Sequence, residues 1–284
     1  MLYDGVVEHA GRWESTYPET KGKGLLARFR RRNEHWGVPR LLGGMLHRAG
    51  PPLRILDIGC GGGWTFLSRF GNVTGVDRNP DALRAACAVY DRIVCAALPR
   101  LPFAGSSFDV VTHVWVAEHL EEPALVELLR EVRRVLRPGG HTIFFADLHS
   151  DKPLMRWARE RPELYRRYHI DAVGHRGLRT LAQTRRLLQR VGFLEVETMP
   201  VNKSSLLQPV TALWMFGNEL GRESRLLRAY LAFCRAVRRS HLAHRAVYAL
   251  LMEYHRRVDR RLPDSYAFSA GFDWRAPAHG PDPV

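Results

Sequence analysis

Cysteine is scarce in this chain, and a long apolar run is missing. The four cysteines, Cys60, Cys87, Cys95 and Cys234, include no Cys-x-x-Cys pair and no nearby histidine at metal-ligand spacing. This pattern predicts reduced, mostly buried thiols and no metal site. No apolar run reaches the length of about 18 residues that a membrane helix needs, and the first residues do not follow the pattern of a signal peptide. We therefore expect a cytoplasmic protein.

Acidic residues are few relative to basic ones. The chain has 43 Lys and Arg against 29 Asp and Glu, a net charge of +14. Such an excess favours nucleic acid, an anionic membrane surface or a phosphorylated substrate as partner. Only four of the basic residues are lysines, and the chain is also rich in Ala, Leu and Gly, which a GC-rich coding sequence would produce as well. A solvated basic surface is therefore favoured over a dedicated polyanion site, and Arg28, Arg30, Arg31 and Arg32 admit the same two interpretations.

The glycine-rich stretch LDIGCGGGWTF lacks the features of the common phosphate-binding loops. Trp64 stands where the dinucleotide pattern GxGxxG has its last glycine, and no Lys-Ser or Lys-Thr follows the glycines, so a P-loop is excluded. The pattern present is acid-x-Gly-x-Gly-x-Gly, from Asp57 to Gly63. A carboxylate directly before the loop would repel a diphosphate and attract a cation.

A second acid, Asp77, ends the next predicted strand. A carboxylate at this place can accept hydrogen bonds from both hydroxyls of a ribose. Taken alone, Asp77 is better explained as a turn or helix-entry residue. Together with the loop one strand earlier, it favours a nucleoside without phosphate that carries an amino group. S-adenosylmethionine fits that description.

Short apolar runs alternate with amphipathic segments from residue 53 to residue 201. The runs predict strands at 53–59, 72–77, 93–98, 108–116, 141–148 and 194–201, and the segments between them include predicted helices at 123–136 and 180–193. Helix-like spacing also follows the glycine loop, at 64–71. This alternation predicts an open, mainly parallel sheet covered by helices, with the ligand at the carboxyl ends of the strands.

The segments that flank this core read as helical. We expect a helical, basic segment at 1–50, which includes 27–36 and 39–50, a core at 51–201 and a helical extension at 202–284 whose tail from Pro263 is irregular. The extension contains one helical stripe from Leu226 to Val237 and another from Val247 to Val258. With the apolar residues Trp214, Met215 and Phe216 it would form a lid, a homodimer surface or a contact with an anionic membrane, or would simply pack on the sheet.

Six motifs occur in order over residues 53–200, namely LDIGCGGG, GVDRNPDAL, LPFAGSSFDVV, EHL, RVLRPGG and RRLLQRVGF. Here the chain resembles the class I S-adenosylmethionine-dependent methyltransferases, in the branch that modifies small molecules and lipids. The resemblance implies an α/β, Rossmann-like fold with a mainly parallel seven-stranded sheet, an antiparallel last strand and helices on both faces. It also implies S-adenosylmethionine as cofactor and S-adenosylhomocysteine as product.

The resemblance assigns cofactor contacts by position. Asp57, Gly59, Cys60 and Gly61 would face the methionine part, Asp77 would bind the ribose, and Arg78 would flank the adenine. Two departures from the family follow. Ala97 replaces an Asp that often contacts the adenine amino group, so that contact is either lost or supplied by backbone around Leu98. His113 replaces a small residue, so a bulky, titratable side chain would stand beside the cofactor, with its backbone near the amino group of the methionine part.

Methyl transfer from a sulfonium needs alignment and exclusion of water, and a general base only for an alcohol, phenol or acidic carbon. His119, after the fourth strand, is the first candidate base, against the alternative of a packing or capping histidine, while Glu118 is expected to be structural. Asp147 and His149 after the fifth strand form a second candidate pair, against the favoured alternative of a polar loop at the strand end. His175 is a third candidate. The insertion with Tyr165, Tyr168 and His169 would wall the acceptor site.

The sequence therefore supports a methyltransferase that acts on a small-molecule or lipid-linked acceptor, of the kind used in natural-product or cell-envelope biosynthesis. Two rival hypotheses stay open. The charge suggests an RNA methyltransferase, but HVWV stands where an Asn-Pro-Pro-Tyr type motif would follow the fourth strand, and nucleic acid is disfavoured as a partner. A non-catalytic cofactor- or partner-binding protein is the other rival, suggested by Ala97 and His113.

Overall fold

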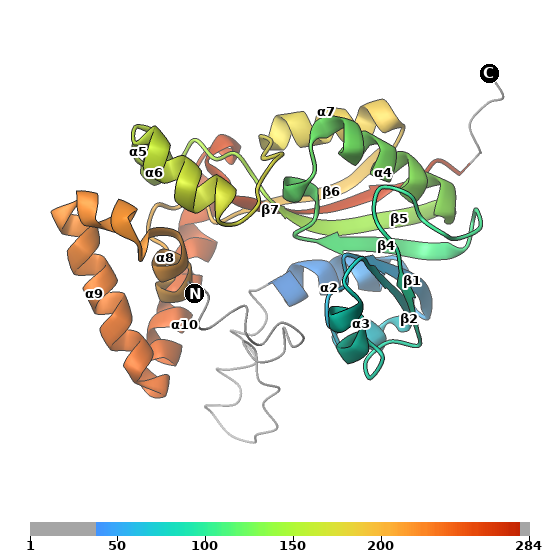
Figure 1. The fold of residues 1–284 in the computed structure, drawn as a ribbon, viewed down its shortest axis with the longest axis horizontal. Helices are drawn as coiled ribbons and strands as arrows, with labels where there is room; N and C mark the ends of the chain where they lie inside the picture. The colour runs from blue at the N-terminus through green and yellow to red at the C-terminus, as the bar shows by residue number, and fades with distance from the viewer. Residues whose placement is uncertain (1–37, 279–284) are drawn as a thin grey trace. The chain divides into compact units, whose positions relative to one another are not determined.

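The computed structural model describes residues 38–278 and shows a seven-stranded sheet with helices on both faces (Figure 1). The strand order is β3-β2-β1-β4-β5-β7-β6. The strands are β1 (Leu53–Ile58), β2 (Gly71–Asp77), β3 (Arg92–Cys95), β4 (Phe108–Val114), β5 (Leu136–Asp147), β6 (Leu194–Val201) and β7 (Ser269–Arg275). The predicted helix at 27–36 and the four N-terminal arginines from Arg28 to Arg32 lie outside the described residues.

The first five strands pair in parallel, as the alternation predicted. Ile55 lies opposite both Val73 of β2 and Val110 of β4, so apolar side chains of three strands meet on one face. The strand β7 runs antiparallel to β5, because Ala276 N–H donates to Gly140 O at 2.8 Å and Leu148 N–H to Phe268 O at 2.7 Å. The predicted Rossmann-like fold with one antiparallel strand is confirmed.

The chain divides into two compact units, which we describe separately. Within the described residues, unit 1 is residues 38–147, 182–199 and 270–278, and unit 2 is residues 148–181 and 200–269. In unit 1, α2 (Val38–Arg48) and α3 (Pro80–Ala86) lie on one face of the sheet, and α4 (Glu122–Val135) and α7 (Leu181–Val191) on the other (Figure 1). A core of Ile55, Val73, Val110 and Ile143 packs against the first pair of helices.

Unit 2 is a helical layer with its own apolar core. Its helices are α5 (Pro153–Arg159), α6 (Pro162–Tyr165), α8 (Pro209–Phe216), α9 (Arg225–Arg239) and α10 (His241–Val258), with a π-helical turn, η4, at Arg166–Asp171. Met215 and Phe216 are fully buried in this core, so they do not form the exposed lid or dimer face that the sequence allowed. No helix within residues 38–278 has the length and apolar content that a membrane span requires.

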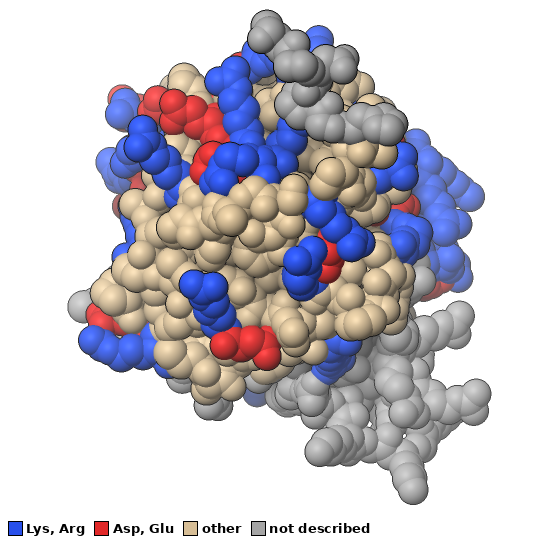
Figure 2. Space-filling model, turned by 90° about the vertical axis from the view of Figure 1, so that its right-hand side faces the viewer, with Lys and Arg blue, Asp and Glu red and all other residues tan. Residues whose placement is uncertain are grey.

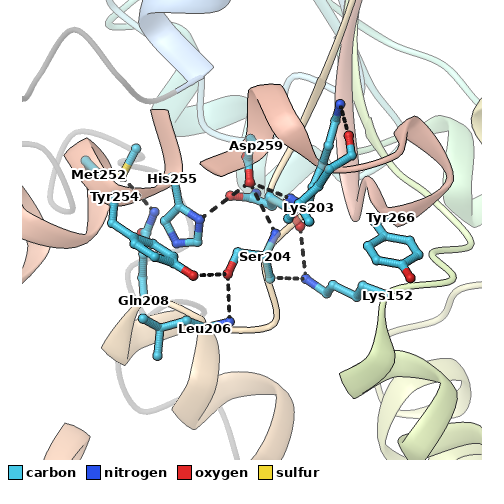
Figure 3. A network of polar contacts seen from close by, with 12 residues as sticks. Lys152, Lys203, Ser204, Leu206, Gln208, Met252, Tyr254, His255, Asp259 and Tyr266 are labelled. Atoms are coloured by element: carbon cyan, nitrogen blue, oxygen red, sulfur yellow. Dashed lines mark hydrogen bonds and ion pairs between the residues drawn. The ribbon is translucent and has the colours of Figure 1, made fainter. Parts of the chain in front are cut away.

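A polar network fixes the loop that follows β6 in unit 2 (Figure 3). The Lys152 ammonium is fully buried and donates to Asn202 O at 3.0 Å and Ser204 O at 3.4 Å. One oxygen of Asp259 accepts from the backbone N–H groups of Lys203 and Ser204, both at 3.2 Å. Hydrogen bonds of this kind hold the loop in one conformation, so Lys152 and Asp259 have a structural explanation.

Three local predictions are wrong. The tail after Pro263 is not irregular, because residues 269–275 form β7, in which every residue except Arg275 is buried. The segment after the glycine loop is not a full helix, because only η2, a 3-10 turn at Leu67–Arg69, forms there. Two of the four cysteines, Cys87 and Cys95, are exposed rather than buried, although all four are free thiols as expected.

Candidate cofactor site

The glycine loop joins β1 to the 3-10 turn and lies against the end of β2. Gly59 N–H donates to Val76 O at 2.8 Å, and Gly59, Gly61 and Gly63 all have positive φ values, of 66°, 51° and 84°. A Cβ on Gly59 would lie 2.7 Å from Val116, whereas a Cβ on Gly61 would meet nothing within 4 Å. The backbone of Gly61 therefore faces open space, which a ligand can approach closely.

Gly63 takes the packing role that the dinucleotide pattern gives to its last glycine. A Cβ at Gly63 would lie 3.1 Å from the Cβ of Val89 and 3.2 Å from the Cα of Ala86, at the end of α3. Compared with a dinucleotide loop, the glycine that packs on the helix is therefore one position earlier, at 63 instead of 64. Trp64 at the next position packs on Phe66, with 4.8 Å between the ring centroids.

Asp57 ends β1 below the loop and is held by a tyrosine that the sequence analysis missed. Tyr90 O–H donates to Asp57 Oδ2 at 2.6 Å and accepts from Trp64 N–H at 2.8 Å. Gly75 on β2 makes room for this ring, since a Cβ there would lie 2.7 Å from both Tyr90 and Cys60. Burial raises the pKa of Asp57 to about 7, the Tyr90 hydrogen bond opposes this rise, and the charge of Asp77 adds to it.

Cys60 lies in the loop between Asp57 and the glycines. Its side chain is 5% exposed, and its Sγ lies 3.7 Å from Gly61 O. Burial, together with the nearby carboxylates of Asp57 and Asp77, raises the pKa of the thiol, so Cys60 stays protonated and is a poor nucleophile. The thiol fills space under the loop, and its predicted cofactor contact would be made by backbone.

Asp77 connects the loop to the end of β2. Its Oδ2 accepts from Gly61 N–H at 2.9 Å and its Oδ1 from Asn79 N–H at 2.8 Å. Each carboxylate oxygen has two acceptor positions, so both can still accept a bond from a sugar hydroxyl. The Asn79 side chain caps α3 by accepting from Asp81 and Ala82 N–H, which fixes the backbone that follows the carboxylate.

The predicted adenine contacts border this carboxylate. Ala96 N–H donates to Asp77 O at 3.0 Å, which brings the segment after β3, with exposed Ala97 and half-buried Leu98, beside the end of β2. Arg78 is exposed next to Asp77, and its backbone oxygen lies 3.8 Å from Cys95 Sγ. These three residues are available to a ligand as predicted, although no contact with one is shown.

His113 does not project its side chain into a ligand site. The ring is 0% exposed and stacks on Phe144 of β5, with 4.1 Å between the ring centroids, and Phe144 stacks in turn on Phe272 of β7. The prediction of a titratable side chain beside the cofactor is therefore wrong. Because side chains alternate along β4, the ring lies on the face of the sheet that carries Phe144 and Phe272. The predicted contact through the His113 backbone stays a prediction.

Replacement of His113 tests this placement. Neither ring nitrogen has a hydrogen-bond partner among the described residues, and burial lowers the pKa to about 3. In the unfolded chain the pKa of His113 is about 6.5. As the pH falls below this value, the unfolded chain takes up a proton before the folded chain does, which lowers the free energy of unfolding. Between about pH 8 and about pH 5, we expect the parent to lose about 2 kcal/mol of its free energy of unfolding that His113→Phe retains. Urea denaturation at both pH values measures this, and parallel losses in the two proteins would contradict it.

Two buried carboxyl groups meet at the carboxyl edge of the sheet in unit 1. Asp147 N–H, at the end of β5, donates to Glu118 Oε1 at 3.4 Å, and Glu118 lies in η3 (Ala117–His119), directly after β4. Burial and the charge of Asp147 both raise the pKa of Glu118 well above its ordinary value. The protonated form of Glu118 is therefore favoured, which the expected structural role did not include. His119, the first candidate base, is half-buried beside it in unit 1.

The other catalytic candidates belong to unit 2. His149 has its side chain 39% exposed and its Nε2 3.9 Å from Asp151, and burial together with the Arg159 cation lowers its pKa. His175 is buried, and its Nδ1 lies 3.1 Å from His169 O. His169 itself packs between rings of Tyr165 and Phe216. A catalytic role for any of His119, His149 and His175 stays a prediction.

Basic side chains are not gathered into one patch on the face that Figure 2 shows. Lys and Arg lie scattered there among uncharged residues, and several stand beside Asp or Glu. Within the described part of the chain many arginines are paired, for example Arg54 with Asp109 at 3.1 Å and Arg190 with Glu122 at 2.6 Å. This distribution agrees with the interpretation of a solvated basic surface for that face.

The sequence of this chain is similar to a known protein family and to several curated relatives. Residues 56–144 match a family model described as a methyltransferase domain. The chain is 38% identical over 111 residues to the ubiquinone biosynthesis O-methyltransferase of Ralstonia nicotianae, a match that covers 34% of this chain and 44% of that protein. It is 34% identical over 146 residues to the phthiotriol/phenolphthiotriol dimycocerosates methyltransferase of Mycobacterium leprae, which covers 47% and 53%. The chain thus spans about half the length of these curated relatives.

Solved structures with low identity share the fold. A phosphoethanolamine N-methyltransferase 2 of Haemonchus contortus, in complex with phosphomonomethylethanolamine and S-adenosylhomocysteine, matches 86% of this chain and 53% of its own, with 19% identity and a TM-score of 0.51. The [4+2]-cyclase SpnF matches 95% of this chain and 88% of its own, with 19% identity and a TM-score of 0.51. These likenesses show the fold alone. The family match over residues 56–144 confirms the resemblance of this part of the chain to the class I S-adenosylmethionine-dependent methyltransferases.

Proposed function

We propose that this protein transfers a methyl group from S-adenosylmethionine to a small-molecule or lipid-linked acceptor. The observation that carries the proposal is the loop at Gly61, whose backbone faces open space while its N–H is held by Asp77. A phosphate-free nucleoside fits this arrangement, because the Asp57 carboxylate favours a cation and disfavours a diphosphate, while Asp77 can accept hydrogen bonds from a ribose. When bound, S-adenosylmethionine supplies an electrophilic methyl group on a sulfonium.

The residues of this chain would then bind and orient. Asp57 and the backbone of the glycine loop would hold the methionine part, and Asp77 the ribose. The raised pKa of Glu118, in η3, favours its protonated form, which can donate a hydrogen bond. The imidazole of His119 beside it would act as the general base for an alcohol or phenol acceptor. An amine acceptor would need no such base.

Asp57 gives this binding a pH dependence. The pKa of Asp57 is raised to about 7 in the absence of a ligand. Below this pH only a minority of the protein molecules have an ionised Asp57, and a cationic cofactor binds best to that minority. We expect the affinity for S-adenosylmethionine to rise about tenfold from about pH 6 to about pH 8. Calorimetry at several pH values measures the rise. In Asp57→Asn, which cannot ionise, the dependence on this group should disappear, and an unchanged pH profile in that variant would contradict its role.

The acceptor class rests on the relatives and on unit 2. The matched relatives are named for ubiquinone, mycocerosate and malonyl-acyl-carrier-protein methylation, all of them small or lipid-linked molecules. Unit 2 contains a π-helical turn at Arg166–Asp171, and such turns occur frequently at functional sites. We propose unit 2 as the part that selects an apolar acceptor.

A methyl-transfer assay tests the acceptor class. The protein is incubated with methyl-labelled S-adenosylmethionine and either a lipid and metabolite extract or total RNA, and the label is followed in each fraction. We expect label in the organic extract and none in RNA. Label in RNA alone would support the RNA methyltransferase instead. The second candidate is a cofactor-binding protein that transfers no methyl group, suggested by Ala97 where the family often has an adenine-contacting Asp. Cofactor binding without label in any fraction would support it.

A further inference from the structure

Helix α9, at Arg225–Arg239 in unit 2, leaves part of its apolar surface uncovered. Leu231, Cys234 and Val237 are buried against the unit, but Leu226 is 83% exposed and Phe233 is 48% exposed. Leu226 and Phe233 are seven residues apart and therefore lie on the same side of the helix, two turns from each other. The sequence placed Leu226 in the packing stripe, and the structure shows instead that it points into solvent.

The same helix is strongly basic. It contains five arginines, Arg225, Arg228, Arg235, Arg238 and Arg239, and no acidic residue. All five are exposed, and none forms an ion pair with another residue in the described part of the chain. This sets α9 apart from α10, where Glu253 pairs with both Arg256 and Arg257.

The two kinds of side chain are ordered around the helix. At 100° per residue, Arg228 and Arg235 lie on the edge opposite to Leu226 and Phe233, and three exposed alanines, Ala229, Ala232 and Ala236, fill the surface between the edges. A helix with an apolar edge, small residues and long basic side chains is the type that lies in a membrane interface. Its arginines reach phosphates while its apolar residues enter the acyl layer.

We propose that α9 binds an anionic lipid surface, with Leu226 and Phe233 in the apolar layer and the arginines on the lipid phosphates. Charge favours this partner over a second copy of the chain, because two α9 helices would bring five arginines against five. An anionic lipid surface is also favoured over nucleic acid, because a phosphate backbone offers no apolar surface to Leu226 and the three alanines. The proposal does not depend on methyl transfer.

Vesicle flotation with the full-length protein tests the proposal. We expect binding to vesicles of equimolar phosphatidylcholine and phosphatidylglycerol, weaker binding at higher salt, and little binding to phosphatidylcholine alone. Arg228→Gln combined with Arg235→Gln should lower the partition coefficient about thirtyfold, from about 1 kcal/mol for each basic residue. Leu226→Ser combined with Phe233→Ser should lower it by about tenfold or more.

Matched controls carry the same changes elsewhere. Leu194 and Val196 of β6 are 51% and 44% exposed, so Leu194→Ser with Val196→Ser removes exposed apolar groups outside α9. Arg130→Gln with Arg186→Gln, on α4 and α7, removes the same charge. Both controls should bind vesicles like the parent, and all four variants should melt at the parent's temperature, since every changed side chain is exposed.

Four results would overturn the proposal. The first two are equal losses of vesicle binding in the controls and the α9 variants, and no binding of the parent to the anionic vesicles. The third is a dimer in sedimentation velocity that the Leu226 and Phe233 variant abolishes. The fourth is tight binding of polyuridylate, abolished by the arginine variant, in a protein that does not bind vesicles. Cofactor calorimetry on the α9 variants should match the parent, so a failure here is separate from a failure of the methyltransferase proposal.

Discussion

Asp77→Ala should lose affinity for S-adenosylmethionine by about 1000-fold, because two hydrogen bonds from a ribose to a charged carboxylate contribute about 1.5–3 kcal/mol each. The same carboxylate accepts from Gly61 and Asn79 N–H, so its loss also frees the loop that faces the ligand. Isothermal titration calorimetry with S-adenosylmethionine and S-adenosylhomocysteine measures the effect. Both ligands carry the ribose and should be affected alike.

Asp81→Ala is the matched control for this variant. Asp81 lies four residues further on in the first turn of α3, is exposed, and pairs only with Arg84 at 2.5 Å among the contacts shown for its side chain. An exposed pair of this kind contributes little to stability, so the control should fold and bind like the parent. Equal binding by Asp77→Ala and Asp81→Ala would show that Asp77 is only a turn residue, as its position alone suggests.

Gly61→Ala should lower cofactor affinity about 100-fold while the fold stays intact, since one methyl group that blocks a close contact costs about 1–3 kcal/mol. A Cβ at this position meets no protein atom within 4 Å, so any effect on binding comes from the space that the ligand would use. The φ value of +51° adds a strain of about 1 kcal/mol to the folded state.

Gly139→Ala separates strain from occlusion. Gly139 has a φ of +75°, and its Cβ would also meet nothing within 4 Å, but it lies in β5 near the turn that starts the strand, at the opposite end from Asp147. The melting temperature should fall by a similar amount in both alanine variants, and only Gly61→Ala should bind the cofactor more weakly. A parallel loss of affinity in the two variants would mean that the Gly61 backbone does not face the ligand.

The sheet core and its glycine loop follow from local sequence. Buried parallel strands read as short apolar runs, and the loop and Asp77 stand at fixed places relative to the strand ends, so the site at the carboxyl edge was predictable. The strand β7 was not, because SAGFDWR contains Gly, Ser and Asp and follows a helical region. Its strand conformation depends on pairing with β5, more than 120 residues earlier in the chain.

The contacts that sequence reasoning missed are also long-range. Tyr90 reaches Asp57 across 33 residues, and its only signal was an aromatic residue after a short helix. The pairing of Glu118 with Asp147 joins the ends of two neighbouring strands and could have been inferred from the parallel order of β4 and β5. The ring of His113 was misplaced because position along a strand does not by itself tell which face a side chain takes.

The central claim is that the glycine loop holds a cationic nucleoside without phosphate. Calorimetric titration of the full-length protein with four ligands, S-adenosylmethionine, S-adenosylhomocysteine, NAD and ATP, tests it most directly. The account predicts saturable binding of the first two and no heat from NAD or ATP, because the Asp57 carboxylate directly before the loop would repel their phosphates. Binding of NAD or ATP with no response to S-adenosylmethionine at millimolar concentration would contradict it.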